Sequence, residues 1–126
     1  DYSLQRARLF GFSSELSAWT MFSITRSAIR ADNYDQFHSL VTEFNKHEFL
    51  GQVRVDRASS IAEYYLKNQK FDQAIEIFTL LREKHPKSEI PLIGLGDVYT
   101  AREDEKRASK YYKKAEALKD TTQKKN

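Results

Sequence analysis

The stretch Ile61-Ala62-Glu63-Tyr64-Tyr65 is matched in pattern, 34 residues later, by Leu95-Gly96-Asp97-Val98-Tyr99. The same offset superimposes a further set of residues: Ala74 on Ala108, Phe78 on Tyr112 and Leu81 on Ala115. A fixed period of this length is typical of stacked helix–turn–helix units. The repeat therefore predicts helix pairs that bury their apolar faces against one another, because one such unit cannot do so alone.

Residue size gives a physical reason for the matched positions. Ala62 and Gly96 fall in the first helix of each unit, and Ala74 and Ala108 fall early in the second helix. Small side chains at these positions let two helices approach closely, while larger neighbouring rings fill the remaining space. Pro86 ends the second helix of the earlier unit, because proline cannot continue the helical hydrogen-bond ladder.

These positions resemble the tetratricopeptide repeat. One unit carries Ala58, Ile61, Ala62, Tyr65, Ala74, Phe78, Leu81 and Pro86, and the next carries Leu92, Leu95, Gly96, Tyr99, Ala108, Tyr112 and Ala115. Ala58 and Leu92 stand where the family often has Trp, and Asp120 where it often has Pro, so the units are divergent members. The resemblance is strong over 55–119 and weak over 17–48. It implies an all-α fold, a short right-handed α-solenoid of antiparallel helix pairs.

The predicted organisation is a single domain over residues 1–126. It comprises a short leading helix at 1–12, a divergent helix pair at 14–50, repeat units at 52–86 and 89–119, and a frayed tail at 120–126. The divergent pair is predicted from the stretch Tyr34-Asp35-Gln36-Phe37, which is similar to Phe71-Asp72-Gln73-Ala74 at an offset of 37 residues. Because the chain begins at Asp1, we expect it to be a piece of a longer protein.

Composition agrees with a helical domain. The chain is 40% hydrophobic with 8 Phe and 7 Tyr, enough for a core, while only 4 Gly and 2 Pro argue for few turns. The net charge is +3, and basic residues crowd the last predicted helix. The absence of cysteine excludes disulfides and thiolate metal sites. No apolar run is long enough to span a membrane. The compartment stays open between cytoplasm and bacterial periplasm.

A search for chemistry predicts no enzyme, no metal and no cofactor. His38 and His47 fall on opposite faces of one predicted helix, so they do not converge on a metal ion. No Ser-x-x-Lys or Gly-x-Ser-x-Gly motif occurs. Gly94-Leu95-Gly96 follows no predicted strand and lacks the third glycine of a dinucleotide loop, so helix packing explains it better.

The family resemblance instead implies binding. In that family the first helices of successive units line a concave groove that holds a peptide or a partner domain. Carried over by position, the groove residues are Trp19, Phe22, Arg26, Arg30, Asp56, Ser59, Ser60, Glu63, Lys67, Ile90, Ile93 and Asp97. Trp19 and Phe22 fit the core equally well. The set does not resemble the Lys- and Asn-rich clamp for terminal carboxylates. The favoured function is therefore a protein–protein interaction or scaffold module whose protein or peptide partner is unidentified.

Two alternatives remain open on the sequence. Divergent repeats of this kind also occur as non-catalytic C-terminal accessory or oligomerisation segments of bacterial hydrolases, in which case the partner is a catalytic domain of the same full-length chain. The segment from Lys106 to Lys114, with Tyr111 and Tyr112, would suit phosphates and bases, although nucleic acid is the less favoured partner. Apolar edges at the ends of a solenoid would also permit self-association.

Overall fold

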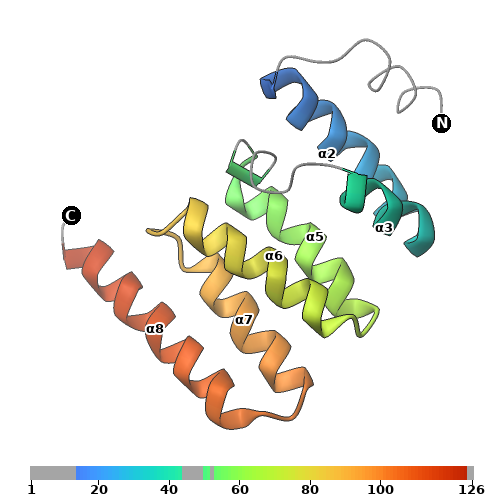
Figure 1. The fold of residues 1–126 in the computed structure, drawn as a ribbon. Coiled ribbons are helices and arrows are strands. Elements are labelled where there is room, and N and C mark those ends of the chain that lie inside the picture. Colours follow the sequence, from blue (N-terminus) through green and yellow to red (C-terminus); the bar gives the residue numbers. More distant parts are fainter. Residues whose placement is uncertain (1–13, 44–49, 52, 125–126) are drawn as a thin grey trace. The chain divides into compact units, whose positions relative to one another are not determined.

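The computed structural model describes the backbone of residues 14–43, 50–51 and 53–124, with side chains from residue 20 to residue 119 inside those ranges. Within this part of the chain the protein is all-helical, which confirms the predicted all-α class (Figure 1). The helices are α2 (Ser14–Arg30), α3 (Tyr34–Glu43), α5 (Val55–Lys67), α6 (Phe71–Lys84), α7 (Ile90–Ala101) and α8 (Glu105–Lys124). The predicted leading helix at 1–12 lies outside the described residues.

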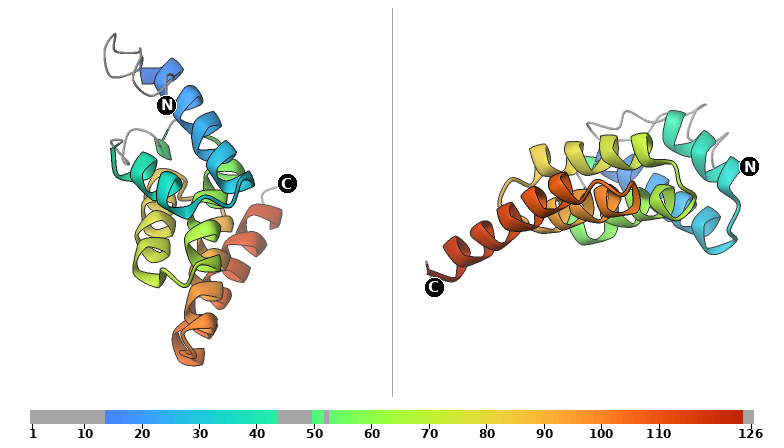
Figure 2. Two further views of the ribbon diagram at one scale, coloured as in Figure 1. Left: turned by 90° about the vertical axis from the view of Figure 1, so that its right-hand side faces the viewer. Right: turned by 90° about the horizontal axis from the view of Figure 1, so that it is seen from below.

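The helices fall into two compact units, residues 1–53 and 54–126. In the first unit α2 packs on α3. In the second unit each helix packs on the next along the chain, and α7 also packs on α5 (Figures 1 and 2). The two first helices of the repeat units, α5 and α7, are therefore direct neighbours, as in a helical repeat. Helix α8 extends past α7 (Figure 2) and continues to Lys124, into the segment predicted to be a frayed tail.

The positions related by the 34-residue period form the interior of the second unit. Buried pairs are Ala58 and Leu92, Ile61 and Leu95, Ala62 and Gly96, Ala74 and Ala108, and Leu81 and Ala115. Close approach explains the glycines: a Cβ at Gly96 would overlap the ring of Tyr112, and a Cβ at Gly94 would overlap the ring of Phe78. The small residues thus admit the rings of α8 and α6, as the sequence predicted for Gly96.

The turns between paired helices repeat in the same way. Asp32, Gln69 and Glu103 have positive φ angles of 53°, 61° and 62°, and their spacings are the 37 and 34 residues of the sequence pattern. After each, a backbone N–H reaches back five residues to a helix carbonyl: Asn33 to Ala28 at 3.0 Å, Lys70 to Tyr65 at 2.9 Å and Asp104 to Tyr99 at 2.9 Å. This is the pattern of a Schellman turn. The divergent pair therefore turns as the two clean units do.

The residue that follows each turn starts the second helix. The side chains of Asn33 and Asp104 accept hydrogen bonds from the N–H groups of Gln36 at 3.2 Å and Arg107 at 3.1 Å, which satisfies one free amide at each helix start. Lys70, at the equivalent position of α6, makes no such side-chain cap. The three turns have the same backbone conformation, but the side-chain cap is present in only two of them.

Candidate partner-binding surface

The exposed side of α5 and α7 contains most of the predicted groove residues of the second unit. Spacings of three and four residues bring side chains to one side of a helix. We call the seven residues at such spacings the first-helix face: Asp56, Ser60, Glu63 and Lys67 on α5, with Ile90, Ile93 and Asp97 on α7. All seven are exposed or half-buried. Because α5 packs directly on α7, they form one surface rather than two separate stripes.

Glu63 and Asp97 bring two carboxylates together on this face. They occupy equivalent positions, 34 residues apart, on the two neighbouring helices. The pKa of Glu63 is raised, first by its partial burial and then by the negative charge of Asp97. Among the described residues, no Lys or Arg forms an ion pair with either carboxylate. The pair is therefore a local excess of negative charge.

Tyr112 fixes one member of the pair. Its hydroxyl donates a hydrogen bond of 2.6 Å to Oδ1 of Asp97, and it lies 3.3 Å from Oγ1 of Thr100. The pKa of Tyr112 is raised by burial and then by this bond to Asp97, so the hydroxyl keeps its proton. The sequence predicted a packing role for Tyr112 and a place in the less favoured nucleic-acid alternative, but it did not predict a bond to Asp97. The available signal was that Tyr stands where the preceding unit has Phe78, so that a hydroxyl was added at a repeat position.

An apolar and a charged feature lie at the start of the face. Ile93 is 40% exposed, a large hydrophobic side chain open to solvent. Arg54, just before α5, forms an ion pair of 3.1 Å with Asp56 in the first turn of that helix. An open hollow here is lined by Arg54, Val55, Asp56, His85 and Ile90. The face therefore offers apolar contact beside carboxylates.

Some predicted groove residues do not belong to an exposed surface. Phe22 is only 5% exposed and Ser59 only 4%, so neither side chain is open to a partner, and the burial of Phe22 agrees with the core alternative. The Ser59 hydroxyl is used within α5, where it donates to the carbonyl of Asp56 at 2.9 Å. Arg26 and Arg30 are exposed on α2, in the first unit. The side chain of Trp19 lies outside the described residues. A single groove joining the two units stays a prediction.

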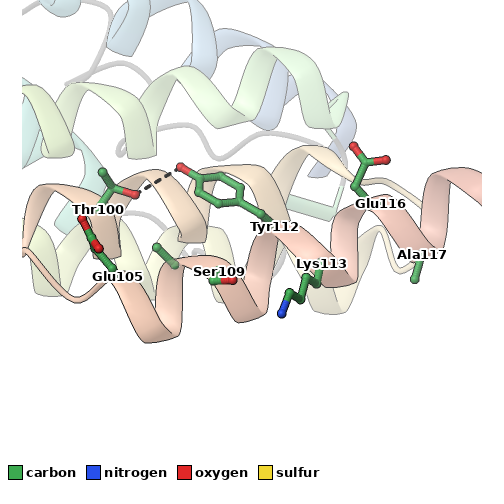
Figure 3. Close-up of a pocket in the computed structure, with 8 residues that line it drawn as sticks. Thr100, Glu105, Ser109, Tyr112, Lys113, Glu116 and Ala117 are labelled. Carbon is green, nitrogen blue, oxygen red and sulfur yellow. Dashed lines mark hydrogen bonds between the residues drawn. The ribbon is translucent and has the colours of Figure 1, made fainter.

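A second open hollow runs along α8 (Figure 3). It is lined by Thr100, Glu105, Ala108, Ser109, Tyr112, Lys113, Glu116 and Ala117, and the Tyr112 ring points from α8 toward Thr100. The preceding unit has Phe71, Ile75 and Phe78 where this one has Glu105, Ser109 and Tyr112. These polar replacements suit a surface in contact with water, so the first-helix face is the better candidate for a partner.

Other kinds of site find no support in the part of the chain that the structure covers. Its His, Asp and Glu side chains nowhere gather in threes as ligands of a metal ion would. None of its helices combines the length and the apolar character needed to cross a bilayer. No protein-family model matches the sequence, and no curated protein matches it.

Proposed function

We propose that this chain is a protein–protein interaction module of the tetratricopeptide kind. Two observations support the assignment to that repeat: the 34-residue period of buried small and large residues, and the three equivalent turns at Asp32, Gln69 and Glu103. Stacked helix pairs of this kind present broad surfaces that recognise other proteins. An interaction role uses exposed side chains on a rigid scaffold and needs no reacting group.

The partner binds on the first-helix face. The observation that carries this proposal is the Glu63–Asp97 pair, because two like charges held together on packed helices are more stable when a cation lies between them. Tyr112 holds Asp97 in place before any partner arrives, which lowers the entropy lost on binding. Ile93 supplies apolar contact next to the charges.

This arrangement defines the chemistry of the partner. A Lys or Arg side chain would bridge the two carboxylates, and Arg would do so through several N–H donors. An apolar side chain beside it would cover Ile93. The partner is therefore a peptide segment or a protein surface in which a basic residue neighbours an apolar one.

Selection of peptides from a random displayed library on the full chain tests this function. The expected result is enrichment of sequences that place Lys or Arg beside an apolar residue. Their affinity should fall about tenfold or more in Glu63→Gln/Asp97→Asn, because two charge-assisted contacts are lost. Glu83→Gln/Glu116→Gln, a matched loss of two exposed carboxylates on α6 and α8, should leave affinity unchanged. Selected peptides that bind the double variant as tightly as the unaltered protein would overturn the proposal.

The accessory or oligomerisation role in a longer enzyme remains a second prediction. No contact or charge distribution described above favours it over a module that binds a separate partner.

A further inference from the structure

Three cations that the first-helix face does not use lie on the second helices of the two repeat units. Arg82 lies on α6, and Lys110 and Lys114 lie one helical turn apart on α8. Lys110 is exposed, and the other two side chains are half-buried. None of the three forms an ion pair with another residue that the structure describes. They are a local excess of positive charge, the opposite of the Glu63–Asp97 pair.

Two stacked tyrosines support this group of cations. The rings of Tyr99 and Tyr111 are parallel, with an interplanar angle of 1° and centroids 5.6 Å apart. The Lys114 ammonium lies 5.4 Å from the centroid of Tyr111, and the Arg107 guanidinium lies 5.7 Å from that of Tyr99. A cation held over an aromatic face is attracted by the electrons of the ring. The stack therefore gives Lys114 a favourable contact although other cations lie nearby.

Electrostatics show that the cations affect one another. The pKa of Lys114 is lowered, first through loss of surrounding water and then by the positive charges of Arg82 and Lys110. An anion bound beside these cations would relieve their repulsion, whereas a neutral group or a further cation would not. The positions and the charges of these side chains therefore both favour a negatively charged ligand.

We propose that Arg82, Lys110 and Lys114, which we call the basic face, form a second interaction surface for an acidic protein segment. Lys110 and Lys114, one turn apart on the helix, match two Asp or Glu side chains at a similar separation. A nucleic acid is the less suitable polyanion, because proteins that bind single strands stack bases on aromatic rings. Here the rings of Tyr99 and Tyr111 already stack on each other and lie beneath cations.

Binding of a fluorescent oligo-glutamate peptide to the full chain tests this surface, with oligothymidylate as the competing polyanion. In Lys110→Gln/Lys114→Gln the affinity for the peptide should fall about tenfold at moderate salt, as expected for the loss of two exposed ion pairs. Lys70→Gln/Lys87→Gln removes the same net charge outside α6, α8 and the first-helix face and should change the affinity by less than about twofold. Circular dichroism confirms that each variant is folded.

Three results would overturn the proposal. The first is peptide affinity that falls equally in both double variants, which would show a response to net charge alone. The second is peptide binding that survives in Lys110→Gln/Lys114→Gln. The third is tighter binding of oligothymidylate than of the peptide, lost in that same variant, which would make the face a nucleic-acid surface. Glu63→Gln/Asp97→Asn should leave peptide binding to the basic face intact, so the two proposed surfaces fail or succeed separately.

Discussion

The α5–α6 pair and the α7–α8 pair have the same order of helices and turns but differ in the size and polarity of their matched side chains. The earlier pair has Ala62, Phe78 and Leu81 where the later pair has Gly96, Tyr112 and Ala115. Phe78 is fully buried, whereas Tyr112 is half-buried and uses its hydroxyl to hold Asp97. A repeat position can therefore keep its packing role and take on a second role at the surface. Comparing matched substitutions in the two pairs separates these roles.

The largest expected difference concerns the matched rings. Phe78→Ala should lower the free energy of unfolding by about 3–5 kcal/mol, because it removes a fully buried ring and leaves a cavity. Tyr112→Ala should cost clearly less, because its ring is only half-buried. Urea titration followed by circular dichroism measures both. A loss at Tyr112 equal to or greater than that at Phe78 would contradict the assignment of Phe78 to the better-packed position.

The next difference concerns the helix starts. Asp104→Ala should destabilise the protein by about 1 kcal/mol, since it removes the acceptor for the Arg107 amide. Lys70→Asp should raise stability by a similar amount, because it supplies an acceptor at the equivalent position of α6. Thermal melts of the two variants should shift in opposite directions. If Lys70→Asp has no effect while Asp104→Ala is costly, the two turns are less alike than their backbones indicate.

A smaller effect is expected from the Tyr112 hydroxyl alone. Tyr112→Phe restores the residue type of the earlier pair and removes the 2.6 Å bond to Asp97. Stability should fall by about 0.5–1.5 kcal/mol, and affinity for a basic peptide should fall because Asp97 is no longer fixed. Calorimetry and peptide titration measure the two effects. Unchanged affinity in a folded Tyr112→Phe variant would show that the hydroxyl does not prepare the first-helix face for binding.

The smallest predicted stability change is a gain. Because the pKa of Glu63 is raised in the folded protein, the folded state is most favoured below the ordinary pKa of glutamate, and stability falls as pH rises through the raised value. Glu63→Gln should therefore increase stability at neutral pH by about a few tenths of a kcal/mol, after allowance for solvent screening. The gain should vanish in acid, where Glu63 is protonated. Melts at both pH values measure it, and a gain that persists in acid would contradict an electrostatic origin.

The sequence predicted the buried positions of α5 to α8 well because those positions follow from packing. Ala62, Ala74 and Phe78 are buried where helices pack on one another, and the 34-residue period was enough to identify these positions. It did not separate Ser59 and Phe22 from the exposed surface, because whether a helix position faces solvent depends on small rotations that a family pattern does not record. The bond between Tyr112 and Asp97 joins residues on two helices, so it could not be read from local spacing.

The most direct test of the first-helix face is the affinity of a selected basic peptide for Glu63→Gln, measured beside the melting temperature of the same variant. We expect weaker binding together with equal or higher stability, because the negative charges of Glu63 and Asp97 weaken the fold slightly by repelling each other but attract a basic partner. Glu83→Gln should match the unaltered protein in affinity. Retained affinity in a folded Glu63→Gln variant would contradict the claim that the first-helix face of α5 and α7 is the binding surface.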